Sequence, residues 1–304
     1  MPAHIEQTKE FELSTPDRVA LFVRDWPLPD AVQGQAQGVL IMHGLGEHCG
    51  RYAHVARFFN ALGFAVRTYD HRGHGKSGGA AGDVPDDDSI LHDARLVMND
   101  FGKQLAGPPL LFGHSMGGLF AARFALEEQA PLRGLILSSP ALAIRMSGFQ
   151  QVLLKLASAL IPGVGIPNGL ETRYLTHDGE VIQAYENDAL VHPRISARLL
   201  RSMLRSMDYV HDNAPSLKIP VLLLAAADDR IVDLTGSERF LARLPPDIVT
   251  AYFYEGYYHE IFNELDATRV FDDLRAWLEQ QGYTPLATQA QAPEPALSAS
   301  WAGI

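Results

Sequence analysis

Two five-residue stretches of the chain carry the pattern Gly-x-Ser-x-Gly, which can present a serine hydroxyl for nucleophilic attack on a carbonyl. The first covers residues 75–79 (GKSGG) and contains Ser77, and the second covers residues 113–117 (GHSMG) and contains Ser115. A serine becomes an effective nucleophile only where a general base accepts its proton and an acid orients that base. The flanking sequence must therefore show which serine can react, and which histidine and carboxylate serve it.

Ser115 has the flanking sequence that a nucleophile elbow requires. The apolar run PPLLF (108–112) predicts a buried strand before it, and MGGLFAARFALEE (116–128) predicts a helix after it. The start of that helix offers a backbone N–H and the positive end of the helix dipole to a developing oxyanion. We therefore predict that Ser115 is the nucleophile.

Ser77 lacks this context. It is followed by GGAAGDVPDDD (78–88), a composition typical of loops. Its Gly-Lys-Ser sequence also matches the end of a phosphate-binding loop, but the glycine that such a loop needs five positions earlier is Asp70. We expect this segment to be a glycine-rich loop that leaves a strand.

The base and the acid follow from chain order, which in folds with such an elbow runs serine, acid, histidine. The acid belongs on the loop after a late strand, and PVLLLAAADDRIVD (220–233) supplies one. Only His259 follows that loop, which makes it the predicted base. Asp228, Asp229 and Asp233 all compete for the acid, and spacing alone does not separate the first two. The other histidines after the nucleophile fall in a helical segment described below: His177, His192 and His211.

Two backbone N–H groups are predicted to hold the oxyanion. One belongs to Met116, directly after the nucleophile, and the other to Leu45 in the loop IMHGLGEHCGRY (41–52), which follows an earlier strand. His43 and His48 in the same loop raise the alternative of a metal site. No histidine or carboxylate accompanies them at the usual ligand spacing on a helix, so we expect no metal.

Short apolar runs alternate with longer amphipathic stretches, which predicts a mostly parallel sheet covered by helices on both faces. The strand runs are nearly continuous in their apolar character, as expected for strands buried on both faces. Ser89 is a candidate N-cap for the helix that begins near it. Expected strands are 18–26, 38–43, 64–70, 108–113, 132–139, 220–227 and 249–255, and expected helices are 51–63, 89–106, 116–128, 234–244 and 265–281.

Residues 141–215 interrupt this alternation. They contain two amphipathic pieces, FQQVLLKLASALIPG (149–163) and PRISARLLRSMLRSMDYV (193–210), joined by a connector rich in Gly and Pro. We predict a helical insertion between two strands of one core domain, made of residues 1–140 and 216–283.

Composition argues against several classes of protein. The net charge is −11, from 25 Lys and Arg against 36 Asp and Glu, which disfavours wrapping a nucleic-acid backbone. Cys49 is the single cysteine, so no internal disulfide can form. The N-terminus shows no basic run followed by an apolar stretch, and no run of about 18 apolar residues occurs. We therefore expect a cytoplasmic protein with a disordered tail at residues 284–304, where Ala, Pro, Gln and Ser dominate.

Seven segments, in order along residues 10–282, resemble the α/β-hydrolase fold and, within it, the monoacylglycerol lipase and lysophospholipase-like branch. So many ordered matches are far more specific than one Gly-x-Ser-x-Gly. The segments are HGLGEHCGRY, DHRGHGKSGG, GHSMGG, SSPAL, YENDALVH, PVLLLAAADDRIVD and YEGYYHEIFNE.

The resemblance implies an acid, a cap and a set of headgroup contacts. The family's acid stands in a pattern like G-x-x-D-R, which matches Asp229, with Ala226 in place of the glycine. Residues 141–215 correspond to a helical cap that forms an apolar acyl tunnel over the serine. Some members carry a second histidine three residues after the catalytic one, facing the glycerol; Phe262 stands there in this chain and implies a more apolar entrance. The positions that meet the glycerol head correspond to Glu47, Arg51, His114 and Tyr185.

These features predict a serine hydrolase that cleaves carboxylic esters of lipid-like substrates through an acyl-enzyme. It is expected to be most similar to monoacylglycerol lipases and to need no metal or organic cofactor. Lysophospholipase or general short- and medium-chain carboxylesterase activity is an alternative, as are acyltransferase or perhydrolase activity and a non-catalytic ligand receptor. A serine at the elbow argues against an epoxide hydrolase or a dehalogenase, which would carry Asp. The stretch VLLKLASALIPGVGIP (152–167) is a candidate for contact with a membrane or lipid droplet.

Overall fold

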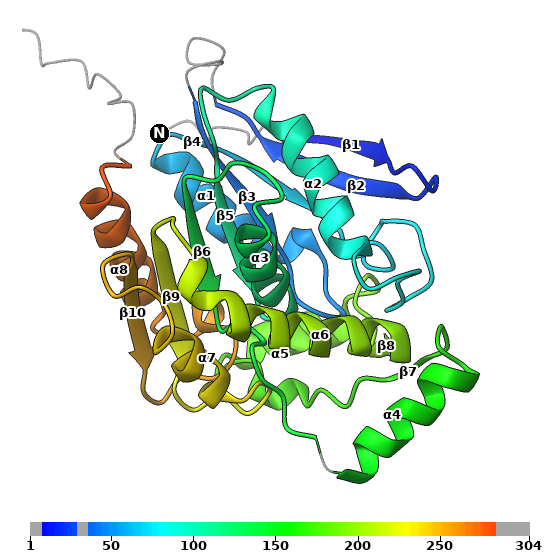
Figure 1. Ribbon diagram of the computed structural model, residues 1–304. Coiled ribbons are helices and arrows are strands. Elements are labelled where there is room, and N and C mark those ends of the chain that lie inside the picture. The colour runs from blue at the N-terminus through cyan, green and yellow to red at the C-terminus, as the bar shows by residue number, and fades with distance from the viewer. Residues whose placement is uncertain (1–7, 29–35, 147, 284–304) are drawn as a thin grey trace, which may run out of the picture.

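An eight-stranded sheet forms the centre of the protein (Figure 1). The structure is a computed structural model and describes residues 8–28, 36–146 and 148–283 of the 304-residue chain. At one edge of the sheet, the first strand pairs antiparallel with the second, and the second pairs antiparallel with the third. The six strands from the third to the opposite edge are parallel to one another. Across the sheet the order is β1 (Lys9–Ser14), β2 (Ala20–Trp26), β4 (Phe64–Tyr69), β3 (Gln37–Met42), β5 (Leu110–His114), β6 (Gly134–Ser138), β9 (Val221–Ala226) and β10 (Val249–Tyr254).

Helices cover both faces of this sheet, as the alternation of apolar runs predicts. One face carries α2 (Ser89–Gly102), α3 (Met116–Leu126), α6 (Ala197–Asn213) and α7 (Leu234–Leu241), and the other carries α1 (Ala53–Ala61) and α8 (Ala267–Gln280). The short 3₁₀ turn η2 (Cys49–Tyr52) precedes α1, and the 3₁₀ turn η5 (Ile261–Asn263) precedes α8. The expected α/β-hydrolase architecture is therefore confirmed.

The sheet separates two apolar cores because successive side chains of a strand point to opposite faces. In β3, Leu40 and Met42 pack under α2 and α3, whereas Val39 and Ile41 pack under α1. All four side chains are at most 1% exposed. Burial on both faces explains why these strands read as continuous apolar runs, and it holds the strand ends rigidly in place.

Three details differ from the expectations. The edge strand β1 was not predicted. Its side chains are exposed or half-buried, so the sequence has no apolar run there. Ser89 is not an N-cap: it is the first residue inside α2, and its Oγ accepts the backbone N–H of Asp86 at 3.2 Å. The segment between β6 and β9 also contains a small antiparallel sheet. The predicted disorder of the tail concerns residues 284–304, which lie outside the described residues.

Residues 141–215, which we call the cap segment, lie between β6 and β9, two neighbouring strands of the sheet. The small sheet pairs its two short strands through Gly165–Pro167 and Arg194–Ser196. The elements of the cap segment are α4 (Gly148–Leu160), β7 (Gly165–Pro167), η3 (Thr172–Tyr174), α5 (Gly179–Asn187), β8 (Arg194–Ser196), α6, and most of η4 (Ala214–Ser216).

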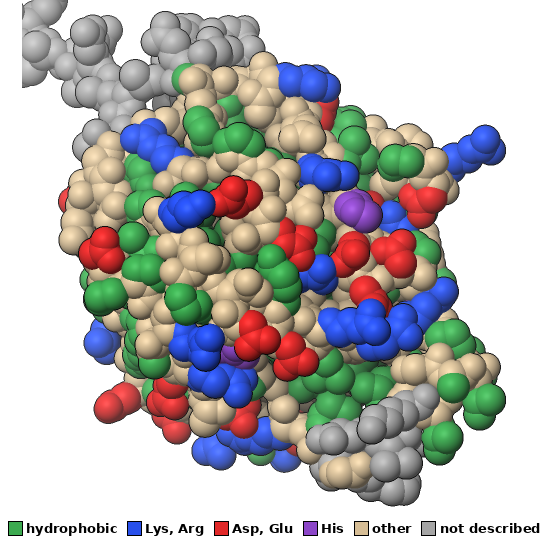
Figure 2. Space-filling model, viewed as in Figure 1, with side chains coloured by type: hydrophobic (Ala, Val, Ile, Leu, Met, Phe, Trp, Pro, Cys, Tyr) green, Lys and Arg blue, Asp and Glu red, His purple; other side chains and the backbone are tan. Residues whose placement is uncertain are grey.

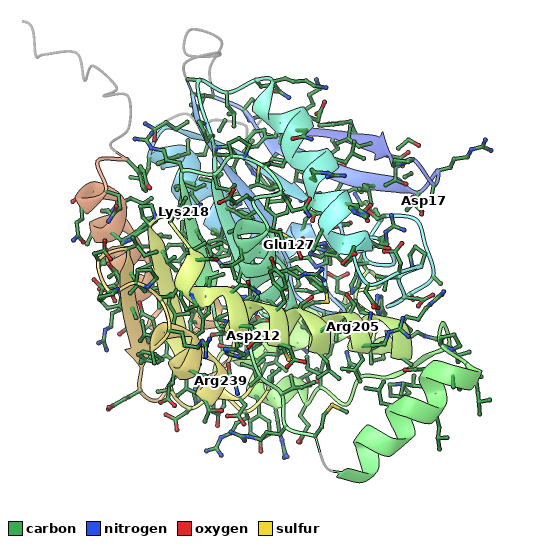
Figure 3. The ribbon with its side chains drawn as sticks, viewed as in Figure 1. Asp17, Glu127, Arg205, Asp212, Lys218 and Arg239 are labelled. Carbon is green, nitrogen blue, oxygen red and sulfur yellow. The ribbon has the colours of Figure 1, made fainter. Side chains whose placement is uncertain are left out.

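Ion pairs join α6 of the cap segment to the core, and several apolar side chains of the cap segment are exposed to solvent. Arg198 pairs with Asp83, and Arg205 of α6, labelled in Figure 3, pairs with Asp87. Beside α6, Figure 2 shows apolar side chains gathered at the lower right, over α4. No helix within the described ranges is long and apolar enough to span a bilayer. The exposed apolar residues of this region are Leu156, Leu160, Ile161, Val164 and Ile166.

Candidate active site

Ser115 lies in a sharp turn between β5 and α3. Its backbone has φ 54° and ψ −119°, a conformation that a residue other than glycine adopts only at an energetic cost. Close packing enforces the turn. A Cβ on Gly117 would lie 2.3 Å from the Met42 carbonyl oxygen, and one on Gly113 would lie 2.5 Å from the Gly117 carbonyl oxygen. Both glycines of the pattern are therefore needed for the strand and the helix to approach each other.

His259 and Asp229 form a buried pair. Asp229 follows β9, and His259 follows β10, the neighbouring strand. Oδ2 of Asp229 lies 2.7 Å from Nδ1 of His259, and the two side chains are 1% and 2% exposed. Oδ1 of Asp229 accepts the backbone N–H groups of Ile231 and Val232 at 2.8 and 3.0 Å. The carboxylate is thus held on both oxygens, and it orients the imidazole through Nδ1.

The charges of this pair raise the pKa of the histidine. Burial by itself would lower the pKa of His259, but the Asp229 carboxylate, assisted by Glu260 and Glu47, raises it above the ordinary value of 6.5. Burial also opposes ionisation of Asp229, yet contact with His259 and with the two N–H groups lowers the pKa of this carboxyl. An imidazolium at His259 would therefore be stabilised by a carboxylate that stays ionised.

The two other candidate acids have different partners. Asp228 lies at the surface, where its Oδ2 accepts the backbone N–H of Gly256 at 2.7 Å. Asp233 caps α7, accepting the Thr235 backbone N–H at 3.2 Å and its hydroxyl at 2.9 Å. Of the three carboxylates that chain order leaves open, the structure brings Asp229 to His259.

A cavity of about 510 Å³ contacts Ser115 and His259 and extends between the core and the cap segment. The two expected oxyanion donors, Leu45 and Met116, line it as well. An apolar lining of this kind accommodates an apolar group and excludes water from the serine. Much of that lining comes from the cap segment: Met146, Leu154, Ile166, Ile195, Leu200 and Met203.

The four polar residues that the resemblance assigns to a headgroup lie in two layers. Glu47, His114 and Tyr185 line the cavity of Ser115. Arg51 lies behind Glu47 and lines a second, much smaller cavity. Its Nη1 is 2.5 Å from Oε2 of Glu47, and its Nη1 and Nη2 are 2.6 and 2.7 Å from the two carboxylate oxygens of Glu260. Its guanidinium carbon also lies 4.7 Å from the ring centre of Tyr185.

Glu260 is a residue of this site that sequence reasoning does not identify. It directly follows His259, is 5% exposed, and lines the large cavity. Burial alone would raise the pKa of Glu260, but the Arg51 guanidinium lowers it. Its position next to the predicted base was the one available signal, because its partner Arg51 is distant in sequence.

The ring of His114 lies beside the predicted base, tilted by 56° from the ring of His259. The ring centres of His114 and His259 are 4.8 Å apart, and Nδ1 of His114 lies 3.0 Å from Oγ of Ser138. Burial and the neighbouring His259 lower the pKa of His114 to about 4. His114 is therefore neutral near pH 7 and meets a substrate as a hydrogen-bonding group without charge.

Phe262 does not make the entrance of the cavity more apolar, so that expectation is wrong. Its ring is 7% exposed and packs 5.5 Å from the ring of Phe112 and 5.0 Å from that of Phe271, measured between centres. It lines the small cavity behind Glu47 rather than the large one. Phe262, three residues after the predicted base, therefore belongs to the apolar core that also contains Phe112 and Phe271.

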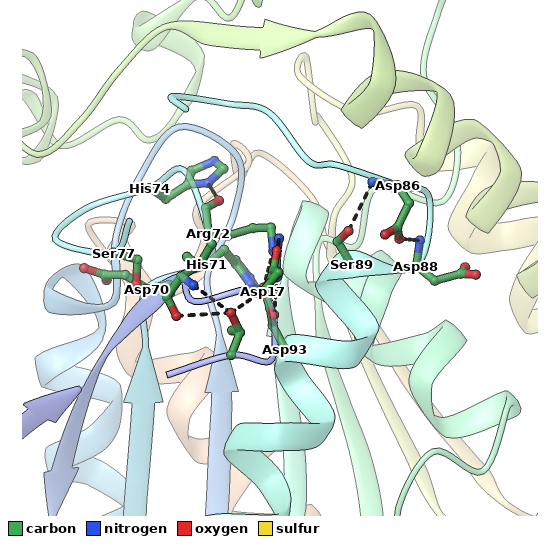
Figure 4. Close-up of polar contacts among 12 residues, drawn as sticks. Asp17, Asp70, His71, Arg72, His74, Ser77, Asp86, Asp88, Ser89 and Asp93 are labelled. Carbon is green, nitrogen blue, oxygen red and sulfur yellow. Dashed lines mark hydrogen bonds and ion pairs between the residues drawn. The ribbon is translucent and has the colours of Figure 1, made fainter. Parts of the chain in front are cut away.

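Ser77 is a structural residue of its loop (Figure 4). Its Oγ donates to the carbonyl oxygen of Asp70 at 2.6 Å and accepts the backbone N–H of Phe22 at 2.8 Å. The same loop places Arg72 against Asp93, with Nε 2.5 Å from Oδ2. The Gly-x-Ser-x-Gly that contains Ser77 thus joins the loop to β2, as expected for a glycine-rich loop that leaves a strand.

The histidines of the first loop have protein partners. His43 lies in a buried group with its ring centre 4.3 Å from that of His71. His48 contacts Asp188 of the cap segment, with Nε2 2.8 Å from Oδ2. Within residues 8–28, 36–146 and 148–283, no set of three His, Cys, Asp or Glu side chains could hold a metal ion.

Comparison with known proteins relates this arrangement to lipases. The family model described as serine aminopeptidase, S33, matches residues 34–266. A monoacylglycerol lipase from Mycolicibacterium smegmatis is 33% identical over 248 residues, which cover 79% of this chain and 87% of that protein. An uncharacterized abhydrolase domain-containing protein from Dictyostelium discoideum is also 33% identical, over 88% of this chain, which spans 29% of that longer relative.

Solved structures show the same likeness. The crystal structure of the monoacylglycerol lipase from Paleococcus ferrophilus matches with a TM-score of 0.78 at 32% sequence identity. The match covers 86% of this chain and 99% of that one.

Proposed function

This chain belongs to the serine aminopeptidase S33 family of α/β-hydrolases, and we propose that it cleaves monoacylglycerols or closely related lipid esters through an acyl-enzyme. Its similarity to lipases makes it a carboxylic ester hydrolase. The observation that best supports the mechanism is the buried His259–Asp229 pair, whose histidine lines one cavity with a serine in a strained turn. We assign the nucleophile to Ser115, the base to His259 and the orienting acid to Asp229.

The reaction proceeds in two matching halves. In the first, Nε2 of His259 takes the Ser115 proton while Oγ attacks the ester carbonyl, and the resulting oxyanion binds the N–H groups of Leu45 and Met116. The tetrahedral species collapses, the bond to the alcohol breaks, and His259 returns the proton to that alcohol. In the second half, water loses a proton to His259 and attacks the carbonyl of the acyl-enzyme. The bond to Oγ of Ser115 then breaks, His259 returns the proton to Oγ, and the fatty acid leaves.

The lining of the cavity supports a substrate with an apolar chain and a small polar head. The apolar side chains of the cap segment would contact the acyl chain, and Glu47, His114 and Tyr185 would meet the alcohol part. Arg51 lies one layer further back, so we propose that it acts through Glu47 and Glu260. Lysophospholipids and simpler esters share the acyl part and differ at the head.

A panel of esters tests this assignment. Monoacylglycerols, lysophospholipids and nitrophenyl esters of several chain lengths are compared, with an aminoacyl anilide for the peptidase activity that the family description names. We expect the highest kcat/KM for a monoacylglycerol with a medium or long chain. A clear preference for lysophospholipids or for the anilide would replace the proposed substrate, and transfer to added alcohol or peroxide would indicate an acyltransferase or perhydrolase.

The exposed apolar side chains over α4 support a proposal of contact with aggregated lipid. Leu160 is 77% exposed, and its neighbours Leu156 and Ile161 are exposed as well. Burying such side chains in lipid is favourable by roughly 25 cal/mol for each Å² of apolar surface. The activity on one monoacylglycerol should therefore rise when its concentration passes the aggregation threshold. An activity curve without a change of slope at that threshold would contradict the proposal.

The acid limb of the pH profile should lie above pH 6.5. The base must be neutral to accept the serine proton, and Asp229 raises the pKa of His259 above that value. The rate constant kcat/KM is thus expected to be low at pH values where the imidazole is protonated and to rise through the raised pKa. In Asp229→Asn the remaining activity should show its acid limb at lower pH. An unmoved limb in that variant would argue against Asp229 as the source of the raised pKa.

A further inference from the structure

Two buried side chains that perform no step in this mechanism hold the loop that carries Leu45. Both contacts fall on Gly44, the preceding residue. Its N–H donates to Oε1 of Glu47 at 2.6 Å, and its carbonyl oxygen lies 2.7 Å from Nδ1 of His43. His43 is fully buried, and Glu47 is 3% exposed. A Cβ on Gly44 would lie 2.8 Å from Oε1 of Glu47 and 3.3 Å from Cβ of Ser115, so the loop runs tightly between the two.

The hydrogen bonds of His43 determine which ring nitrogen carries its proton. The backbone N–H of His71 donates to Nε2 of His43 at 2.9 Å, so this nitrogen accepts and bears no proton. Burial, together with His71 and His74, lowers the pKa of His43 well below its usual range, and the ring is neutral. A neutral ring with an unprotonated Nε2 carries its proton on Nδ1, which therefore donates to the Gly44 carbonyl.

This bond acts on the peptide group that contains the expected oxyanion donor. The carbonyl of Gly44 and the N–H of Leu45 belong to one peptide unit, which is trans. In a planar trans peptide the two bonds point in opposite directions, so holding the carbonyl at His43 directs the Leu45 N–H away from that ring. A hydrogen bond to the carbonyl oxygen also polarises the amide and strengthens its N–H as a donor.

We propose that His43 is a positioning residue of the oxyanion hole: its Nδ1–H holds the Gly44–Leu45 peptide so that the Leu45 N–H meets the oxyanion. The inference rests on the proposed function, because it requires Ser115 to attack a carbonyl. Glu47 holds the adjoining N–H of Gly44, and through Arg51 it is joined to Glu260 beside the base. The loop of the oxyanion hole and the loop of the base thus share one buried polar framework.

Two substitutions of His43 separate its two hydrogen bonds. His43→Asn places an amide N–H near the position of Nδ1 and keeps the donor to the Gly44 carbonyl. His43→Gln places an amide oxygen near the position of Nε2 and keeps the acceptor for the His71 N–H, but it loses the donor. Since a small misplacement of a catalytic group can cost about 100-fold in rate, we expect kcat of His43→Gln to fall about 10- to 100-fold. His43→Asn should recover most of that loss.

The readout distinguishes the oxyanion hole from general damage. Both variants are measured on a short nitrophenyl ester for kcat and KM, and with a trifluoromethyl ketone, which forms a tetrahedral adduct with an active serine. His43→Gln should lower kcat and weaken inhibition by the ketone by similar factors, with KM little changed, because the oxyanion forms only after attack. Rates are divided by the number of sites that a fluorophosphonate labels at completion.

His74→Gln provides a matched control in the same buried group of histidines (Figure 4). His74 donates from Nδ1 to the carbonyl oxygen of Arg72 at 3.0 Å, and its ring centre lies 5.4 Å from that of His43. Replacement by Gln removes this donor in the same way but leaves Gly44 untouched. It should lower the melting temperature without changing the affinity for the ketone.

Two results would overturn the inference. One is a His43→Gln variant that binds the ketone as tightly as the wild type, or that loses no more than His43→Asn. The other is an imidazole nitrogen NMR spectrum of the wild-type protein in which His43 carries its proton on Nε2, a measurement that needs no folded variant. Failure of the proposed function would look different, because wild-type protein would then neither hydrolyse esters nor lose activity with Ser115→Ala.

Discussion

Ser115→Ala is expected to abolish ester hydrolysis, with a loss in kcat of about 10⁴- to 10⁶-fold. The substitution removes the oxygen that forms the acyl-enzyme. Because alanine is smaller and keeps the backbone of β5 and α3, the protein should fold and melt near the wild-type temperature. Hydrolysis of a nitrophenyl ester and labelling by a fluorophosphonate measure the effect.

The Gly-x-Ser-x-Gly that contains Ser77 provides the control for this experiment. Ser77→Ala removes the acceptor of the Phe22 N–H and the donor to the Asp70 carbonyl, so it should lower the free energy of unfolding by about 1–3 kcal/mol. Activity per folded molecule should stay close to that of the wild type. Near-wild-type hydrolysis by Ser115→Ala, or a complete loss in a folded Ser77→Ala protein, would invalidate the assignment of the nucleophile.

Asp229→Asn should lower kcat by about 10²- to 10⁴-fold, whereas Asp228→Asn should have little effect. The asparagine side chain can donate to Nδ1 of His259, which favours the wrong tautomer, and it no longer stabilises the imidazolium. Asp228 instead accepts the N–H of Gly256, a bond that an asparagine oxygen can replace. Steady-state kinetics of both variants, with circular dichroism to check the fold, give the comparison.

The paired design makes the outcome unambiguous. Both substitutions remove one negative charge from neighbouring residues on the same loop after β9, so any general effect of charge is common to them. Equal losses in the two variants would contradict the choice of Asp229. A larger loss in Asp228→Asn would reverse it.

Local patterns in the sequence predicted much of the fold. Continuous apolar runs such as PVLLLAAA mark strands buried on both faces, and seven of the eight strands of the main sheet lie where such runs predict them. β1 was missed because an edge strand buries little of its surface and needs no apolar run. Ser89 was misplaced by one residue, a typical error where several polar residues precede a helix.

The contacts behind the cavity could not be predicted from the sequence, because they join residues far apart in the chain. Arg51 and Glu260 are separated by 209 positions, and no local pattern pairs them. Phe262 is buried among phenylalanines of α8 and β5, although its distance from His259 in sequence suggested the entrance. The position of Phe262 depends on how η5 and α8 pack. The resemblance to a family could not predict that packing, because this chain has Phe where some members have His.

The sequence by itself determined where a serine could stand at the end of a buried strand and before a helix, and which histidine follows the last strand. These are properties of chain order and of apolar runs, which short segments carry on their own. Chain order left Asp228 and Asp229 open and the family resemblance favoured Asp229, but only the tertiary structure shows that Asp229 contacts His259 while Asp228 bonds to Gly256, since neighbouring side chains in a turn point to different partners. It also decided that Ser77 bonds to β2 while Ser115 faces a cavity, because burial depends on the packing of distant segments.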